Sequence, residues 1–371
     1  MFKWTRSSRR SLKSTAATAI MALVMSSTAM SAVACTRYIA QTDHGAIVMR
    51  SVDWGEKLGA VGHVHPVGEA RRTSDVDQYG KAAEWSVKYH TVAMEEHELF
   101  HGASVEAIND QGLSAMGLYQ NNSKPFNELH SDKGFPAVSL SDFTAFVAEN
   151  YATVAEVLEA HEKGEFQIAW GSKMRGSDTF HGVHFSVVDK SGDIALFQLN
   201  EGGTEVVHIG DAASDLRVMT NSPLQQDHRE YVEQFDLSNN RLGADLPSTI
   251  GSLDRNLRLL WSSQYQDYSG KSYDQTMGQI QMAFDNAVLV PHGIEDPADN
   301  GSSATYATWI SFRYNLDNGE ITTRSLETAK EITFTLEDTK AYGGPVCADL
   351  IQQADSGKAT VTWGSCNGAA S

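Results

Sequence analysis

Polar and apolar residues alternate along the chain after position 34, and this alternation is typical of half-buried strands. Thr36–Ala40 and Ala46–Arg50 flank the turn-forming segment Asp43–Gly45, so we expect a β-hairpin there. A second hairpin turn is expected at Asp189–Asp193, between two apolar runs. The same pattern predicts further strands at Val61–Val67, Ser86–Met94, Leu113–Leu118, His184–Val188 and Ile194–Leu199.

Apolar residues recur every three or four positions in the middle of the chain, which indicates helices. Ser141–Asn150 is such a segment, and Ser141 is a suitable N-cap for it. Strands followed by helices and again by strands favour stacked sheets with helices on their outer faces. No repeat or flexible linker interrupts residues 35–371, so we expect a single domain. The other expected elements are helices at Val154–Glu162, from about Arg255 through Trp261 and at Asp274–Phe284, and strands at Thr305–Tyr314 and Ile332–Leu336.

Composition and charge exclude some classes of partner. The chain has 371 residues, of which 41% are hydrophobic and 20% charged, as in a globular protein with a sizeable core. Its net charge is −18 and its isoelectric point about 5.1, which argues against a nucleic-acid partner. Residues 1–34 carry Lys3, Arg6, Arg9, Arg10 and Lys13 and no acid, so their removal would change −18 to −23.

The first 34 residues have the layout of a secretory signal. A basic start is followed by an uncharged stretch, Ser14–Ala34, which ends in Ala32-Val33-Ala34, with small residues at −1 and −3 relative to Cys35. We therefore expect cleavage after Ala34 and a periplasmic or secreted protein without stable membrane association. A transmembrane anchor is the alternative, although Ser and Thr interrupt the apolar part. Arg9-Arg10 faintly resembles a twin-arginine export signal, so the export route stays open.

Cys35 would become the first residue after this cleavage. Its thiol and a free α-amine would then share one residue, and their ordinary pKa values of about 8.5 and 7.7–8.0 allow the amine to activate the thiol. Such an N-terminal nucleophile needs no histidine. The other two cysteines, Cys347 and Cys366, either pair in an oxidising compartment or remain free thiols near the C-terminus.

Three other interpretations of Cys35 compete. It is an ordinary cysteine near a cleavage site, or the lipidated cysteine of an envelope lipoprotein that binds a ligand, or the nucleophile of a thiol hydrolase with a histidine partner. Lipidation is disfavoured because Ala32 and Val33 stand where a lipobox has Leu and a small residue.

Five short motifs in order resemble the choloylglycine hydrolase family, which includes bile salt hydrolases and penicillin V acylases. The resemblance extends from Cys35 to about Tyr314. Each motif is weak alone, but five in the family's order are fairly specific. They are Cys35-Thr36, Arg50-Ser51-Val52-Asp53-Trp54, Asn109-Asp110-Gln111-Gly112-Leu113 leading to Gly117-Leu118-Tyr119, Thr220-Asn221-Ser222-Pro223, and Leu246-Pro247 followed by Arg255.

The resemblance implies an α+β fold, the four-layer αββα sandwich of the N-terminal nucleophile hydrolases, and hydrolysis of a linear amide through a thioester. In this interpretation Asp53 orients the α-amine of Cys35, while Arg50 and Arg255 are cations near the sulfur. The amide of Asn221 and the backbone N–H of Tyr119 would stabilise the oxyanion. Many family members carry Asn where this chain has Tyr119, which makes bile-salt specificity less secure. The family also implies a homo-oligomer, a tetramer.

Candidate substrate-binding residues are the large apolar side chains Trp54, Trp85, Met94 and Phe100, at least half of which we expect to be ordinary core. The substrate would be a small molecule that joins an apolar acyl group to a small polar amine: penicillin V, an acyl-homoserine lactone or a conjugated bile acid. His63-Val64-His65 places two histidines on one face of a strand, and His181 and His184 are also close in sequence. No acid or cysteine completes a ligand set nearby in the sequence, so we expect no metal and no other cofactor.

Overall fold

The computed structural model describes residues 35–76, 78–239, 245–293 and 306–366. The predicted signal segment, residues 1–34, lies outside them. Among the described residues, no helix has the length and apolar character needed to cross a bilayer.

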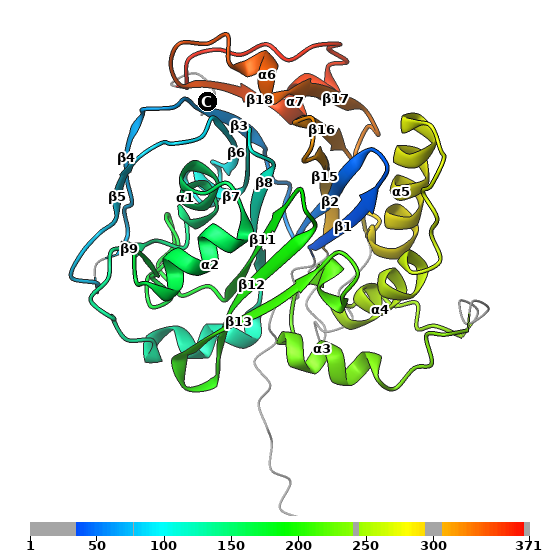
Figure 1. Ribbon diagram of the computed structural model, residues 1–371, viewed down its shortest axis with the longest axis horizontal. Coiled ribbons are helices and arrows are strands. Elements are labelled where there is room, and N and C mark those ends of the chain that lie inside the picture. Colours follow the sequence, from blue (N-terminus) through cyan, green and yellow to red (C-terminus); the bar gives the residue numbers. More distant parts are fainter. Residues whose placement is uncertain (1–34, 77, 240–244, 294–305, 367–371) are drawn as a thin grey trace, which may run out of the picture.

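Two large antiparallel sheets form the centre of the molecule (Figure 1). The first has six strands in the order β14 (Val218–Thr220), β1 (Thr36–Thr42), β2 (Gly45–Trp54), β15 (Ala307–Asn315), β16 (Glu320–Ser325) and β17 (Glu331–Thr335). The second has eight, in the order β13 (Thr204–Asp211), β12 (Asp193–Asn200), β11 (Val183–Asp189), β8 (Leu113–Tyr119), β7 (Ala103–Asn109), β6 (Thr91–Glu96), β3 (Val61–His65) and β18 (Val346–Asp349). Two small sheets pair β4 (Ala70–Arg72) with β5 (Glu84–Ser86), and β9 (Ala137–Val138) with β10 (Gln167–Ile168).

Helices cover the outer face of each large sheet, α1 and α2 on one side and α4 and α5 on the other (Figure 1). Residues of both sheets, among them Ile39, Val64 and Phe312, share the core between them. The expected αββα sandwich is therefore confirmed. The helices are α1 (Phe143–Asn150), α2 (Val154–Glu162), α3 (Gln225–Val232), α4 (Ser252–Ser263), α5 (Tyr273–Val288), α6 (Leu336–Thr339) and α7 (Leu350–Asp355), with 3-10 segments at Asn121–Leu129, Glu201–Gly203 and Asp215–Arg217.

Two local predictions need correction. The helix expected from Ser141 begins at Phe143, and its N-cap is Asp142. The strand expected over Ser86–Met94 is two strands, because the backbone N–H groups of residues 88 and 89 donate to the carbonyl of Glu149 at the end of α1. These hydrogen bonds connect the segment between β5 and β6 to α1, so residues 88 and 89 do not pair with a neighbouring strand.

The C-terminal segment is fixed to the eight-stranded sheet by a disulfide. Cys347, on β18, is bonded to Cys366, 19 residues later. Cys35 is a free, buried cysteine. Of the two alternatives that the sequence left open, the structure has the disulfide, and Cys35 keeps its thiol.

Candidate active site

Cys35 lies directly before β1, and its side chain is 5% exposed, in the core between the sheets. β1 is paired on one side with β2 and on the other with β14, with Thr36 opposite both Ser51 and Thr220. The residues that follow these partners, Asp53 and Asn221, are consequently brought beside Cys35. The antiparallel register of three strands thus builds the site.

Arg50, on β2, is a buried cation beside the sulfur of Cys35. Its guanidinium donates to the carbonyls of Ser51 at 2.8 Å and Gly117 at 2.9 Å, so its position is fixed. Burial acts to lower the pKa of Arg50, but the Cys35 sulfur and the carboxylate of Glu106 outweigh it and hold that pKa above its ordinary value. Arg50 therefore remains charged, and the sulfur of Cys35 has a buried cation beside it.

Asp53 has a fully buried carboxyl group at the end of β2. Its Oδ2 lies 3.5 Å from Nη1 of Arg255, while its Oδ1 accepts no hydrogen bond from the described residues. Burial raises the pKa of Asp53 to about 6, although Arg255 opposes the shift. A buried carboxylate with one oxygen unfilled is suited to receive a further cation or N–H donor.

Arg255, near the start of α4, joins the parts of the site. Its Nη1 donates to the Cys35 carbonyl at 3.2 Å and to Oγ1 of Thr36 at 2.6 Å. Its Nη2 donates to Oδ1 of Asn221 at 3.3 Å. The helix contributes one fully buried side chain that holds the backbone of the nucleophile, Asp53 and Asn221 together.

Asn221 and Tyr119 are brought into contact from the two different sheets. The nitrogen of Cys35 donates to Oδ1 of Asn221, and Nδ2 of Asn221 donates to the carbonyl of Tyr119 at 2.8 Å. In an antiparallel ladder the N–H and C=O of one residue point to the same side. The backbone N–H of Tyr119 therefore points to the side on which Asn221 lies. With the second hydrogen of the Asn221 amide, it provides two N–H donors close to Cys35, whose nitrogen contacts the same amide.

All six residues predicted as catalytic thus lie in one constellation, in which Tyr119 is half-buried and the other five are buried: Cys35, Arg50, Asp53, Tyr119, Asn221 and Arg255. The arrangement provides a thiol, cations beside it, a carboxylate and two N–H donors. Those groups are the components of acyl transfer to sulfur.

An aromatic cluster adjoins this constellation. The ring of Trp54 lies 5.6 Å from that of Phe100 and 5.6 Å from that of Tyr119, each in an edge-on arrangement. His181 contacts the same rings and is 3.2 Å from the Tyr119 hydroxyl through Nδ1. Trp54 and Phe100 therefore belong to one aromatic cluster with Tyr119, a residue of the constellation around Cys35. His181, noted in the sequence only as part of a histidine pair, is a member of this cluster that sequence reasoning missed.

The other two predicted substrate-binding residues are located differently. Met94 is buried in the core cluster that also contains Cys35. Trp85 lies on β5, outside the large sheets, where its ring packs edge-on against Phe146 of α1 and its Nε1 donates to Glu149. Trp85 is thus a packing residue of the outer helical layer, as expected for part of the predicted set.

Glu106 was missed by sequence reasoning altogether. It is fully buried on β7, and its Oε1 lies 3.9 Å from Nε of Arg50. Neither carboxylate oxygen accepts a hydrogen bond from the described residues. Burial raises the pKa of Glu106 to about 7, although Arg50 acts against the shift. Glu106 is a positioning residue, which lies behind Arg50 rather than at the sulfur.

Replacing Glu106 by Gln is expected to change how stability depends on pH. The folded-state pKa of about 7 lies above the ordinary 4.5. The wild type therefore loses stability relative to Glu106→Gln as pH rises from about 4 to 8, by about 3 kcal/mol. Urea unfolding of both proteins at several pH values measures this difference.

Glu84→Gln is the matched control, because the side chain of Glu84 is 68% exposed. Its difference in unfolding free energy from the wild type should change little with pH. An equal pH dependence in both variants would contradict the assignment of a buried, perturbed carboxyl to Glu106.

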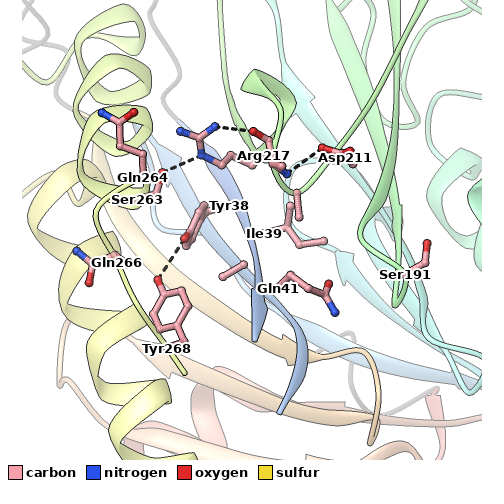
Figure 2. Close-up of a pocket in the computed structure, with 13 residues that line it drawn as sticks. Tyr38, Ile39, Gln41, Ser191, Asp211, Arg217, Ser263, Gln264, Gln266 and Tyr268 are labelled. Carbon is pink, nitrogen blue, oxygen red and sulfur yellow. Dashed lines mark hydrogen bonds between the residues drawn. The ribbon is translucent and has the colours of Figure 1, made fainter. Parts of the chain in front are cut away.

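A separate cavity of about 500 Å³ opens beside the other end of β1 (Figure 2). Tyr38 and Tyr268 lie in its wall and are hydrogen-bonded to each other, with their hydroxyl oxygens 3.2 Å apart. Arg217 donates to Oγ of Ser263 on its wall. None of the six predicted catalytic residues lines this cavity, so it is distinct from the site at Cys35.

Comparison with known proteins agrees with the motifs and the fold. Residues 35–248 match the family described as linear amide C–N hydrolases, choloylglycine hydrolase family. A penicillin V acylase from Pectobacterium atrosepticum is 26% identical over 261 residues, which are 68% of this chain and 65% of that protein. The match therefore spans just under two thirds of that relative's length.

Two solved structures share the fold. The penicillin V acylase from Agrobacterium tumefaciens matches with a TM-score of 0.69 and 23% identity, covering 85% of this chain and 91% of that one. A variant of the conjugated bile acid hydrolase from Clostridium perfringens matches with a TM-score of 0.63 and 16% identity, covering 82% and 93%.

Proposed function

Because this chain belongs to the choloylglycine hydrolase family of linear amide C–N hydrolases, we propose that it hydrolyses a linear amide bond with the Cys35 thiol as nucleophile. The observation that carries this proposal is the junction at Arg255, which binds the backbone of Cys35, the carboxylate of Asp53 and the amide of Asn221 at once. These three groups and Arg255 come from four segments of the chain, and they meet at the residue that carries the nucleophilic sulfur.

The first half of the reaction forms a thioester. The α-amine of mature Cys35 takes the thiol proton, and the thiolate, next to Arg50, attacks the amide carbon. The oxyanion of the tetrahedral intermediate accepts hydrogen bonds from the Tyr119 N–H and the Asn221 amide. When the C–N bond breaks, the leaving amine takes the proton from the α-ammonium group. The acyl group remains on sulfur.

The second half reverses these roles. The α-amine takes a proton from water, and the hydroxide formed attacks the thioester carbon. The same two donors stabilise the second oxyanion. The C–S bond then breaks, the carboxylic acid leaves, and the proton returns to sulfur. Asp53 holds the amine through the cycle, because its unfilled Oδ1 is a buried acceptor beside the nucleophile's backbone.

Replacing Asn221 by Ala is expected to lower kcat by about 10²- to 10³-fold, because one of two oxyanion donors is lost. The KM should change much less, since the oxyanion exists only after attack. Steady-state kinetics on the mature enzyme with penicillin V measures both constants.

Asn109→Ala is the control for this variant. Asn109 and Asn221 are both 1% exposed, but the amide of Asn109 donates to the carbonyls of Ala148 and Tyr151 in the outer layer. Asn109→Ala therefore measures how much kcat falls when a buried side-chain amide is removed at a position remote from the sulfur. An equal loss of kcat in both variants would show that the effect at Asn221 is structural.

Processing after Ala34 and export to the periplasm or medium are part of the proposal. Burial of Cys35 supports a free nucleophile over the lipoprotein alternative, since a diacylglycerol group on a side chain 5% exposed would displace the core. Intact-mass analysis of protein purified from the native host tests this. A chain that begins at Cys35 with unmodified amine and thiol is expected. A lipid adduct or a different first residue would overturn the mechanism.

The aromatic cluster favours an apolar, ring-bearing acyl group. The rings of Trp54, Phe100 and Tyr119 pack edge-on against one another, and the backbone of Tyr119 contacts Asn221. Burial lowers the pKa of His181, so its ring is neutral at pH 7. A phenoxyacetyl amide such as penicillin V fits this chemistry, and penicillin V acylases are among the similar proteins. We propose penicillin V as the first assay substrate.

A hydrolysis panel on the mature protein decides the substrate class. It should contain penicillin V, acyl-homoserine lactones of several chain lengths, and glycine- and taurine-conjugated bile acids. Higher kcat/KM for penicillin V than for the conjugated bile acids is expected. Preference for the bile acids would refute the proposed acyl specificity but keep the amidase mechanism, whereas inactivity on all three classes would count against the amidase itself.

A further inference from the structure

A cluster of histidines and carboxylates lies on the outer face of the eight-stranded sheet and takes no part in the amidase site. Its centre is formed by His63 and His65 of β3 and Glu95 of the neighbouring β6. Val64 and Met94, which alternate with these residues, point to the core between the sheets that contains Cys35. The cluster is therefore separated from the nucleophile by the thickness of a sheet.

The three side chains bring their donor atoms to one point. One ligand atom from each of His63, His65 and Glu95 lies within 4.8 Å of the other two. Oε1 of Glu95 is 3.0 Å from Nδ1 of His63 and 3.8 Å from Nε2 of His65. Zinc bonds of about 2.0–2.1 Å at tetrahedral angles place ligand atoms roughly 3.3 Å apart. The two distances lie on either side of this value, so a small cation fits between the three groups with small side-chain rotations.

Two of the three ligands, His65 and Glu95, have outer contacts of the kind that metal-bound groups usually have. Nδ1 of His65 is 3.1 Å from a carboxylate oxygen of Glu69, which leaves Nε2 as the metal-facing atom. The second oxygen of Glu95 is 2.9 Å from Nε2 of His97. A histidine whose other ring nitrogen bonds a carboxylate is a common arrangement at zinc sites, because it fixes the tautomer and orients the ring.

The net charge of the cluster and an unpartnered ring nitrogen both favour binding of a divalent cation. Glu69, Glu95 and Glu149 surround His65, and among the described residues the guanidinium that contacts two of them is that of Arg71. Three carboxylates and one guanidinium have a net charge of −2 when the histidines act as neutral metal ligands. His65 is fully buried, and its Nε2 has no hydrogen-bond partner among the described residues. A divalent cation would neutralise both charges and give that buried nitrogen a partner.

We propose that His63, His65 and Glu95 bind one divalent cation of the zinc class, with a water molecule as the fourth ligand. The sequence alone did not reveal this set, because Glu95 is 30 residues beyond His65 and joins it only through the pairing of β3 with β6. The cation crosslinks these two strands on the face away from Cys35, so its role is structural. Solvent reaches it past His63 and His97, whose side chains are 16% and 26% exposed.

Zinc content and affinity test the proposal directly. Tag-free mature protein, stripped with a chelator and dialysed against Zn²⁺, is expected to retain one zinc per chain by elemental analysis. Competition with a chromophoric chelator should show at least about 100-fold weaker binding for His65→Ala and Glu95→Gln, and about 10- to 100-fold weaker binding for Glu69→Gln. Glu69→Gln alters only an outer contact, so it remains informative if the other two variants fold poorly.

His161→Ala is the matched control, because it removes a histidine from a His–Glu pair that has a single histidine, His161 with Glu205. It should bind zinc as the wild type does. Cys347 and Cys366 form an alternative ligand set with His63 if their disulfide is reduced, because the three side chains also lie close together. A double Cys347→Ser, Cys366→Ser variant should keep its zinc, and Co²⁺ bound to the wild type should show no thiolate charge-transfer band. No stoichiometric zinc in the wild type, unchanged affinity in Glu95→Gln, or loss of zinc only in the double serine variant would each overturn the assignment.

Discussion

Mature protein in which Cys35 is replaced by Ala is expected to lose hydrolysis of penicillin V by at least about 10⁴-fold in kcat. The reason is that every covalent step of the proposed mechanism uses this sulfur, while the other buried groups only stabilise charge around it. The fold should survive the change, because Ala is smaller than Cys. Asp53 and Arg255 form an ion pair without the thiol, and Arg50 is held by the carbonyls of Ser51 and Gly117. Single-turnover assays with excess enzyme measure the loss without interference from trace wild type.

Cys35→Ser is the companion variant. It keeps the size, the position and the α-amine, so its activity reports the nucleophile alone. Mass spectrometry of reaction mixtures quenched in acid should detect an acyl adduct on the wild type and none on Cys35→Ala. Substantial turnover by Cys35→Ala, with correct processing verified, would eliminate the cysteine mechanism whatever the substrate.

The second large effect is expected from a single leucine placed before Cys35. The nitrogen of Cys35 is then an amide, which cannot accept the thiol proton. Loss of a general base typically costs about 10²- to 10⁴-fold in rate. The thiol, Arg50 and the oxyanion donors are all retained, so the experiment isolates the α-amine. The structure of the full chain represents this state, since its Cys35 nitrogen is an amide that donates to Asn221.

Removal of the leucine with an aminopeptidase supplies the control within one sample. Activity should recover in proportion to the fraction of chains that mass analysis shows to begin at Cys35. The extended protein should also fail to form the acyl adduct at the wild-type rate. Full activity in the extended protein would mean that some other group is the base, and the histidine-dependent alternative would then be tested by replacing His181, the histidine that contacts the side chain of Tyr119.

Much of the local structure could be predicted because its causes lie within a few residues. Val154–Glu162 is a helix at the predicted bounds, with Thr153 as its N-cap. The first hairpin follows from alternation on both sides of Asp43–Gly45, and its register, with Arg37 opposite Arg50, brings Arg50 and Asp53 back toward Cys35. By contrast, β13 was missed because it is an edge strand whose residues are mostly half-exposed and polar, so its sequence lacks a clear buried face.

The predicted catalytic set depended on motif order as well as on residue chemistry, and the structure places those residues together. The contacts themselves are not local: Asn221 is 186 residues from Cys35, and Arg255 is 220 residues from it. No pattern within a helix or strand specifies such contacts, because they depend on how the layers pack. The family's motifs had indicated them only as a resemblance.

The sequence by itself determined the leading chemistry of this protein: a cysteine behind a signal-like segment, a hairpin that returns Arg50 and Asp53 to it, and the order of strands and helices. Only the tertiary structure decided that Glu106 lies behind Arg50, that Trp85 packs on α1 and that Glu95 meets the two histidines. The physical reason is that turns, caps and alternation act over a few residues along the chain. Charge pairs, aromatic contacts and ligand sets depend on which faces of separate strands the fold brings together.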